Sequence, residues 1–524
     1  MQQRAKPGGS TTIRGPFIPS FSDCFFLAVL VWLFIAGASG WKALLMDGDT
    51  GWHIRTGQYI LEHGRIPHAD LFSYSKPGAP WFAWEWLSDV IFALLFGLGG
   101  LKGIVLFAGL VIAAVATILL RYTVWLRANS LIALLTTLLA VGGSSIHFLA
   151  RPHLFTLLLL PVCLWLLQKD RRQPSRSVWL LVPIVGLWTN LHGGFMVFLA
   201  CLALLVVGSA VEGRLRGSGW GLTYRYSALL GYCCAVTLAN PYGIHLHAHI
   251  LQYLQSDWIR NLVQEFQAPT FRDEGQFQFE IMLLLGLLTA GALLIRRRIP
   301  EVLWLVFLSH CALTSVRHAP LYALLAAPLL AVSLSEWSRQ TTLHAGIRSF
   351  HRILFQLGED LRPGFTRTSL WVCAPLIALS FLNAPVPWPR DFPNEAFPTG
   401  MISRNQHLIT TGRVFTSDQW ADYLIYLYYP NQKVFFDGRS DFYGEDLGKQ
   451  YLALLEGSHR ALAVIRQHGF NVMLLPAGWP LADLLKREPG WTMIASDQQA
   501  ILFAADRANQ QIAGESKPTA GLLK

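Results

Sequence analysis

Long apolar runs separated by short polar loops fill most of the chain up to residue 385. A helix needs about 20 apolar residues to cross the hydrocarbon core of a bilayer, and most of these runs approach that length. The pattern therefore predicts a polytopic α-helical membrane protein. We expect about eleven spans, at residues 24–45, 101–121, 129–149, 153–168, 178–191, 193–211, 226–240, 279–295, 301–316, 318–335 and 369–385.

One stretch, residues 84–100, could be either a short span or a helix lying in the membrane interface. Loop charge distinguishes the two. If the stretch does not span, every strongly basic loop lies on the side of the N-terminus, which the positive-inside rule makes cytoplasmic. We therefore predict an interfacial helix, with the N-terminus inside and the C-terminus outside. The inner loops are then 121–127, 168–176, 212–217 with Arg225, 296–298 and 337–367.

The pattern changes after residue 383. Prolines crowd the stretch NAPVPWPRDFPNEAFP, which predicts an extended linker. Beyond it, the short apolar runs VFTS, KVFFDG, NVMLLP, WTMIAS and AILFAA alternate with helical patterns, which is typical of a small α/β domain. The predicted parts are a transmembrane module at 1–383 with its first external loop and interfacial helices at 46–100, a linker at 384–412, a periplasmic α/β domain at 413–508 and a flexible tail at 509–524.

Composition supports the membrane prediction and limits the possible partners. Hydrophobic residues make up 53% of the chain and charged residues only 14%, against about 25% charged residues in a typical soluble protein. The net charge of +10 is explained by basic inner loops, so we expect membrane lipids and no nucleic acid as partners. The sequence contains no phosphate-binding P-loop, which argues against ATP-driven transport by this chain.

The predicted topology gathers ionisable side chains on the outer face. Acids open the first external loop at MDGDTGWH, and Arg and His follow in the later outer loops. The set is Asp47, Asp49, His53, Glu85 and Asp89 from the first loop, then Arg151, His153, Asn190, His192, Asn240, His245, His247, His249, Glu265, Arg317 and His318. The three histidines of IHLHAH match no zinc-ligand spacing, so we interpret them as structural or interfacial.

Asp47 and Asp49 lie two residues apart, with a glycine between them. Both carboxylates can point to one site, or one can bind while the other caps the helix that starts near Thr50. The segment 50–62 has the spacing of an amphipathic helix on the membrane surface, with His53 on the face of Asp49. A role in capping and packing for the whole set remains an alternative.

The same residues suit a transfer reaction. One carboxylate, Asp47 or Asp49, would act as general base on an acceptor hydroxyl or would help to hold a divalent cation, Mg²⁺ or Mn²⁺. Cationic groups would meet a phosphate leaving group. The candidates for that role are Arg151, His153, His192, Arg317 and His318, although an arginine at a span end also reaches towards lipid headgroups.

A further set is predicted to act in acceptor binding or in a secondary role. The loop FFDGRSDFYG ends a predicted strand and carries Asp437 and Arg439. An Asp/Arg pair that merely shapes the turn is the alternative for these two. The set is His53, Glu85, Asn240, Asp437 and Arg439.

The motifs DGDTGWHI, HGRIPHADLFSYS, EWL, NLHGGF, NPYG and VFFDGRSDFYG together resemble a group of bacterial membrane proteins assigned to the C-type glycosyltransferase (GT-C) superfamily. The resemblance implies an inverting transferase of the bacterial inner membrane. It would move a sugar from a polyprenyl-phosphate-linked donor to a periplasmic glycan, lipid or protein.

The resemblance also maps a first-loop catalytic base or metal ligand onto Asp47 or Asp49. The family often has a second acid in the next external loop, but that loop here is LARPH and has none. The acidic set is then Asp47 and Asp49, with Glu85 as a possible third member.

Two other classes of function remain open. A flippase or transporter would need polar groups near the bilayer midplane, and the predicted span centres carry almost none beyond scattered Ser, Thr and Gln. A non-catalytic scaffold that presents the C-terminal domain would tolerate substitutions at Asp47, Asp49 or Arg317.

Overall fold

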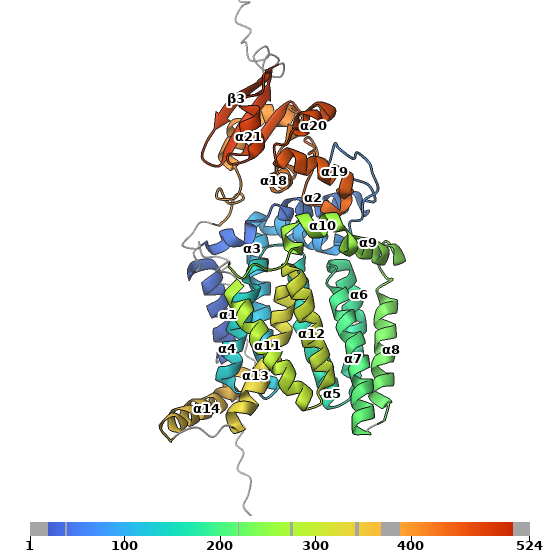
Figure 1. Ribbon diagram of the computed structural model, residues 1–524, viewed down its shortest axis with the longest axis vertical. Helices are drawn as coiled ribbons and strands as arrows, with labels where there is room; N and C mark the ends of the chain where they lie inside the picture. The colour runs from blue at the N-terminus through green and yellow to red at the C-terminus, as the bar shows by residue number, and fades with distance from the viewer. Residues whose placement is uncertain are drawn as a thin grey trace, which may run out of the picture.

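In the computed structural model, a bundle of membrane helices carries the C-terminal domain at one end (Figure 1). The structure describes residues 19–36, 39–217, 219–272, 276–340, 345–367 and 388–506. Among these residues six helices are long and apolar enough to cross a membrane, and two shorter apolar helices accompany them. The bundle helices are α1 (Phe21–Val31), α3 (Trp86–Trp125), α4 (Ser130–Ser144), α5 (His153–Arg172), α6 (Leu181–Leu191), α7 (Phe195–Arg216), α8 (Gly221–Val236), α11 (Phe277–Ile295), α12 (Ile299–Thr314) and α13 (Ala319–Gln340).

The chain is therefore a multi-pass membrane protein, although its first predicted span differs from the prediction. The run 24–45 is not one helix: α1 passes into a π-helical turn at Trp32–Ala36, and a separate 3₁₀ helix covers Gly40–Leu45. Gly40, the first residue of this 3₁₀ helix, has a φ of 53°, a left-handed conformation that glycine adopts without strain. The predicted span at 369–385 lies outside the described residues, so the count of eleven stays a prediction.

Helix α3 is kinked at Gly100, where φ is 59° and ψ is −150°. Its first part packs along α2 (Asp49–His63), near the C-terminal domain, and its second part crosses the bundle (Figure 1). At the opposite end the basic loops contact one another. Arg172 donates to the carbonyl of Leu126, and Arg216 donates to the carbonyl of Arg297. Because of the kink at Gly100, residues 86–99 lie at the end of the bundle that carries the C-terminal domain (Figure 1).

The C-terminal domain contains a four-stranded sheet in the order β1-β2-β4-β3. β1 (Val414–Phe415) is parallel to β2 (Val472–Pro476), whereas β4 (Ala500–Ala505) is antiparallel to both β2 and β3 (Trp491–Ser496). Its helices are α16 (Thr399–Arg404), α17 (Gln406–Thr411), α18 (Asp418–Tyr428), α19 (Ser440–Leu455), α20 (Ala461–His468) and α21 (Pro480–Leu485).

The predicted strand KVFFDG needs correction, because it does not join this sheet. Val434 instead forms a bridge with Ser73 of the first external loop. The hydroxyl of Ser75 donates to the carbonyl of Phe435 over 2.5 Å, and that of Tyr74 donates to the carbonyl of Val414 over 2.7 Å. The first external loop thus pairs with the C-terminal domain instead of lying wholly on the membrane.

The extended linker predicted at 384–412 also needs correction from residue 388 on. Phe392 and Phe397 are buried, and their ring centroids lie 5.4 and 5.3 Å from that of Tyr423. Helices α16 and α17 follow directly. Aromatic and apolar side chains in this stretch therefore anchor it on α18, whereas its prolines alone suggested an extended chain. Residues 384–387 and the predicted tail 509–524 lie outside the described residues.

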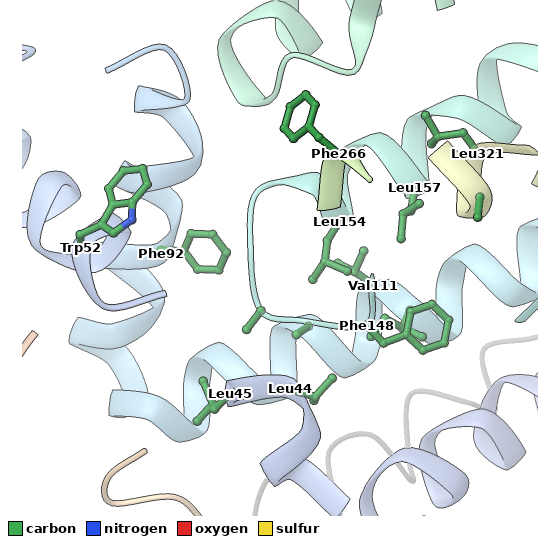
Figure 2. Packing of buried hydrophobic residues seen from close by; sticks show 14 of the residues in the cluster. Leu44, Leu45, Trp52, Phe92, Val111, Phe148, Leu154, Leu157, Phe266 and Leu321 are labelled. Carbon is green, nitrogen blue, oxygen red and sulfur yellow. The ribbon is translucent and has the colours of Figure 1, made fainter. Parts of the chain in front are cut away.

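A continuous apolar core includes residues next to the first-loop acids and next to Arg151, among them Leu44, Leu45, Phe148 and Leu154 (Figure 2). Leu44 and Leu45 are almost fully buried. The Leu44 carbonyl accepts the N–H of Ala150 over 2.8 Å, and Thr50 Oγ1 donates to the carbonyl of Ala150 over 2.9 Å. These bonds hold residues 47–49 and Arg151 side by side on the core.

Candidate active site

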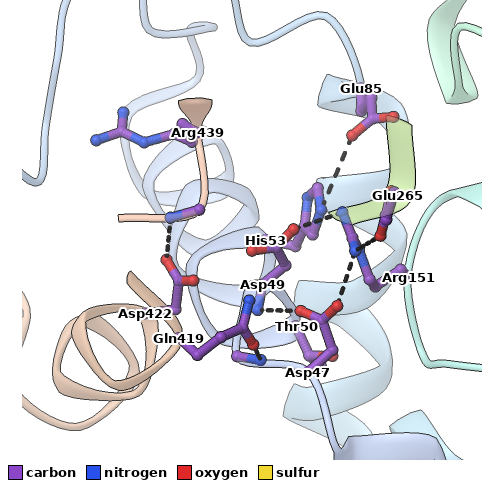
Figure 3. A network of polar contacts seen from close by, with 12 residues as sticks. Asp47, Asp49, Thr50, His53, Glu85, Arg151, Glu265, Gln419, Asp422 and Arg439 are labelled. Carbon is purple, nitrogen blue, oxygen red and sulfur yellow. Dashed lines mark hydrogen bonds and ion pairs between the residues drawn. The ribbon is translucent and has the colours of Figure 1, made fainter. Parts of the chain in front are cut away.

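Helix α2 lies between the bundle and the C-terminal domain, and two glycines allow this close approach. A Cβ on Gly48 would lie 2.3 Å from the carbonyl oxygen of Gln419 on α18, and a Cβ on Gly51 would lie 2.8 Å from that of Asp422. The N–H of Gly48 donates to Gln419 Oε1 over 2.7 Å. The glycines of DGDTG therefore bring α18 against the first-loop acids (Figure 3).

Arg151 forms the centre of an acidic cluster (Figure 3). Its Nη1 lies 2.8 Å from both Asp47 Oδ2 and Glu265 Oε1, and its Nη2 lies 2.5 Å from Asp49 Oδ2. Although burial alone would lower it, the pKa of Arg151 is held well above its ordinary value by the surrounding carboxylates. The guanidinium therefore stays charged and fixes the positions of all three acids.

Asp47 and Asp49 differ in their remaining bonds. Asp47 Oδ1 accepts the N–H of Asp49 over 2.9 Å at the start of α2, so Asp47 uses both oxygens in structural contacts. Asp49 is only 4% exposed, and its Oδ1 receives no N–H bond among the described residues but lies beside the carboxyl of Asp422. Burial raises the pKa of Asp49 to about 7 despite Arg151, and the Asp47 charge adds to the rise.

His53 links this cluster to two further acids. Its Nδ1 lies 2.6 Å from Asp89 Oδ1, its Nε2 lies 3.8 Å from Glu85 Oε2, and its ring stacks on Trp52 at 3.6 Å. Burial lowers the pKa of His53 well below its ordinary value and raises that of Glu85 to about 8. His53 is then neutral near pH 7, and its Nδ1 shares a hydrogen bond with Asp89, whose pKa burial raises well above its ordinary value.

A cavity of about 120 Å³ opens beside this cluster and gathers the predicted phosphate-binding residues. One hydrogen-bond pattern fixes the tautomer of His192. Its Nδ1 accepts the N–H of Gly194 over 3.0 Å and the hydroxyl of Thr156 over 2.8 Å, so Nε2 carries the proton. That proton faces Glu85 Oε1 at 3.6 Å. The ionisable lining residues are Glu85, His147, Arg151, His153, His192, Glu265, Arg317 and His318.

Arg317 differs from Arg151 in its partners. Its guanidinium lies 4.5 Å from the centre of the Phe266 ring and bonds the hydroxyl of Tyr253 over 3.4 Å. Within the described residues no carboxylate lies within ion-pair distance of Arg317. Its positive charge in the cavity wall is thus available to an anion, whereas that of Arg151 is already matched.

A second, smaller cavity of about 60 Å³ lies between the bundle and the C-terminal domain. Asp49 lines it, together with Gly438, Arg439 and Asp441 from the FFDGRSDFYG loop. Asp441 Oδ2 lies 2.9 Å from His249 Nε2 across the interface. The residues that line both cavities are Trp84, Glu85, Arg151, His192, Tyr253 and Arg317, so the two spaces share a wall.

The predicted secondary residues divide into two groups. Asp437 holds Arg439 through bonds of 2.8 and 2.7 Å, and Arg439 also reaches Asp70 over 2.8 Å. This pair shapes the loop, and Arg439 also borders the smaller cavity. Asn240 lines neither cavity, because its side chain bonds the backbone of its own turn at Thr237, Tyr242 and Gly243.

Several residues of the site were not among the predicted site residues. Glu265 and Asp89 had been placed on the outer face but given no role, and Asp422 and Tyr253 had not been singled out at all. The available signal for Asp422 was its acidic position within the otherwise apolar stretch ADYLIYLYY. Its proximity to Asp49 depends on the docking of α18 on α2.

The carboxylates do not fit a resident divalent cation in this arrangement. Asp47, Asp49 and Glu265 all bond Arg151, whose guanidinium supplies the positive charge among them. In the described part of the chain no three His, Cys, Asp or Glu side chains are grouped to hold a metal ion. We therefore derive no chemical step through a metal.

Gly438→Ala is expected to disrupt the site. A Cβ there would lie 2.0 Å from Asp49 Oδ1 and 2.8 Å from Asp422 Oδ2, and both side chains are held by other bonds. Overpacking of this kind costs about 1–3 kcal/mol. Thermal unfolding should show a lowered Tm. The matched control is Gly478→Ala, because a Cβ at Gly478 meets open space; equal Tm values for the two variants would contradict this close packing.

Comparisons with known proteins bear on the fold. No family model matches the sequence, and no curated protein matches it. The oligosaccharyltransferase AglB from Archaeoglobus fulgidus, in complex with an inhibitory peptide and a dolichol-phosphate, matches with a TM-score of 0.53 at 10% identity, covering 93% of this chain and 74% of that chain. The apo form of the oligosaccharyltransferase from that organism matches with a TM-score of 0.51 at 11% identity, covering 87% and 69%.

ArnT from Cupriavidus metallidurans, bound to undecaprenyl phosphate, aligns over 92% of this chain and 97% of its own, at 13% identity and a TM-score of 0.47. At these identities the matches describe the fold and leave the activity open. The oligosaccharyltransferase matches cover most of both chains. Over most of its length the chain therefore has the fold of the GT-C glycosyltransferases.

Proposed function

We propose that this chain is an inverting glycosyltransferase of the bacterial inner membrane. It would move a sugar from a polyprenyl-phosphate-linked donor to a glycan, lipid or protein acceptor on the face that carries the C-terminal domain, the periplasmic face. The observation that carries the proposal is the position of Asp49. Its carboxylate lines the cavity under the C-terminal domain and bonds Arg151, which forms part of the wall shared with the basic cavity.

In the proposed reaction the acceptor hydroxyl lies in the smaller cavity and the donor phosphate in the basic cavity. Asp49 takes the hydroxyl proton as the acceptor oxygen forms a bond to the anomeric carbon of the sugar. The bond from that carbon to the phosphate oxygen breaks, and its electron pair leaves with the polyprenyl phosphate. Arg317 meets the negative charge that develops on this phosphate.

Asp49 is favoured over Asp47 as the base. Both oxygens of Asp47 are already bonded, to Arg151 and to the N–H of Asp49. Asp49 keeps one oxygen free of N–H bonds. The dolichol-phosphate in the AglB structure supports a lipid-phosphate donor for a protein of the same fold.

The proposal is tested by a transfer assay with purified full-length protein in detergent. Radiolabelled polyprenyl-phosphate sugars are offered with a membrane extract as acceptor source, and label in a new product is counted. We expect transfer by the wild type and none by Asp49→Asn. No transfer by folded wild-type protein from a broad donor panel would overturn the proposal. Because Arg151 lies among the acids, we expect EDTA to leave the rate unchanged.

Transfer is expected to rise with pH through about 7. Only the carboxylate form of Asp49 accepts a proton, and burial raises its pKa to about 7, so activity falls as the pH drops below that value. The negative charge of Asp47 contributes to the raised pKa of Asp49. Asp47→Asn should therefore move the acid limb of the pH profile to lower pH. Initial rates between pH 5 and 9 would show both effects; an unmoved limb in Asp47→Asn would argue against Asp49 as the titrating group.

A further inference from the structure

A second large cavity lies at the end of the bundle opposite the C-terminal domain. Its volume is about 770 Å³, several times the 120 Å³ of the basic cavity lined by Arg317. It is formed by the last turns of α5 and α7, the start of α8 and the residue that precedes α12. Five arginines line it: Arg171, Arg172, Arg216, Arg225 and Arg298.

Three carboxylates balance only part of this charge. Arg225 pairs with buried Asp170 over 2.8 Å, and Arg171 lies 3.3 Å from Glu212. Glu301, also fully buried, pairs with Arg171 and Arg298. The five arginines therefore exceed their acids by two positive charges. Asp170 and Glu301 lie behind the cavity wall rather than on it, so the lining itself is still more basic.

The excess charge belongs to Arg172 and Arg216. Arg172 bonds only the carbonyls of Trp125 and Leu126, over 3.1 and 3.0 Å, and no carboxylate in the described residues lies within ion-pair distance of it. Arg216 bonds the carbonyl of Arg297, and the carboxylate nearest to it, Glu212, is 4.0 Å away and shared with Arg171. Both guanidinium groups keep donors that an anion could accept.

Exposed apolar side chains accompany the arginines of this cavity. Leu222 lines it and is 42% exposed, and Leu215 and Trp220, which are next in sequence to the lining residues Arg216 and Gly221, are 48% and 50% exposed. Exposed apolar side chains on a membrane helix next to a cluster of arginines match the two parts of a phospholipid, its acyl chains and its headgroup. A soluble anion would use only the arginines.

We propose that this cavity binds the phosphate of an anionic membrane lipid, with Arg172 and Arg216 holding the phosphate oxygens and the acyl chains lying over Leu215 and Leu222. The same arginines would also accept free phosphate, so the ligand chemistry is a phosphate group and the exposed apolar side chains select the lipid as its source. This site lies at the opposite end of the bundle from Asp49 and does not depend on the transferase reaction.

Mass spectrometry of the intact detergent-solubilised protein tests the proposal. Phosphatidylglycerol is titrated against phosphatidylcholine of the same chain length, and inorganic phosphate is added in a separate arm. The variant is Arg172→Gln combined with Arg216→Gln. The control is Arg214→Gln, which removes one positive charge from an exposed position on α7 that does not line the cavity, and which matches the single variant Arg216→Gln in charge.

We expect wild type and Arg214→Gln to retain phosphatidylglycerol in preference to phosphatidylcholine. The double variant should bind it roughly 30-fold more weakly, because each arginine near the lipid surface contributes about fivefold. Displacement of the lipid by inorganic phosphate alone would support the site with free phosphate as its ligand. Equal retention of the two lipids by wild type, or equal losses in the double variant and the control, would overturn the proposal.

To separate a local effect from unfolding, Arg216→Gln is measured alone. Arg216 is 48% exposed in its side chain, so its replacement leaves the bundle intact. Partial weakening of phosphatidylglycerol binding at an unchanged Tm is expected from this variant. Unchanged binding at an unchanged Tm would remove Arg216 from the site.

Discussion

Asp49→Asn is expected to lower the rate constant of sugar transfer by about 10²–10⁴-fold, the usual contribution of a general base. Asparagine keeps the shape of the side chain and an oxygen for Arg151 but cannot accept the proton of the acceptor hydroxyl. The donor KM should change little, because Asp49 lines the smaller cavity and not the larger basic one. Single-turnover kinetics with a labelled donor would measure the chemical step separately from binding.

Asp47→Asn is the matched control for this prediction. It lies two residues away and makes the same change of charge, but its oxygens only bond Arg151 and the N–H of Asp49. Asparagine keeps an oxygen that accepts the N–H of Asp49 but loses the charge that pairs with Arg151, so we expect a lower Tm and a smaller loss of rate. A fully active Asp49→Asn protein with a wild-type Tm would remove Asp49 as the base.

Arg317→Gln is expected to lower the transfer rate by about 10²–10³-fold, comparable to the loss of a group that stabilises developing negative charge. The argument rests on its partners: within the described residues Arg317 has aromatic neighbours and the Tyr253 hydroxyl but no carboxylate at ion-pair distance. Arg317→Lys keeps the charge but not the geometry of the guanidinium, so it should restore only part of the rate.

A surface arginine provides the control for Arg317. Arg260 on α10 (Asp257–Leu262) has a side chain that is 53% exposed, and its ion-pair partner is the nearby Asp257. Arg260→Gln changes the same net charge and should leave transfer unchanged. Binding of donor analogues that lack the phosphate would add a second test, since Arg317→Gln should not affect their affinity. Equal rates for the two variants would contradict the proposed role of Arg317.

The Asp49→Asn and Arg317→Gln variants also distinguish a transferase from a non-catalytic scaffold. Removal of residues 400–524 would abolish function in either case, because Gly438, Arg439 and Asp441 complete the smaller cavity and the same residues belong to the presented domain. Substitutions at buried Asp49 and half-buried Arg317 change single side chains without removing that domain. A scaffold would keep its phenotype in both, and a transferase would lose it.

The local elements could be predicted from the sequence because each depends on short-range physics. The length of the apolar runs predicted the long membrane helices, and the short apolar runs after residue 412 predicted β2, β3 and β4. The gathering of basic loops at one end and of Asp47, Asp49, Glu85, Arg151 and Arg317 at the other followed from the charge bias of the loops. The first-loop helix at 50–62 matches α2.

Other features could not be predicted, because they depend on partners far away in the chain. KVFFDG has the composition of a strand, yet Val434 pairs with Ser73 of the first loop. The prolines at 384–398 suggested an extended linker, yet Phe392 and Phe397 pack on α18. Local propensity was overridden in both stretches by contacts between the first loop and the C-terminal domain.

By itself the sequence determined a helical membrane protein with a terminal α/β region and a set of acids, arginines and histidines at one end, because hydropathy and loop charge act locally. Only the tertiary structure decided the roles within that set. In the folded chain both oxygens of Asp47 accept bonds, whereas Asp49 Oδ1 faces Asp422 and Gly438. Arg151 pairs with three acids, whereas in the described part of the chain Arg317 has no carboxylate at ion-pair distance. These differences arise from packing between α2, α18 and loops more than 100 residues apart.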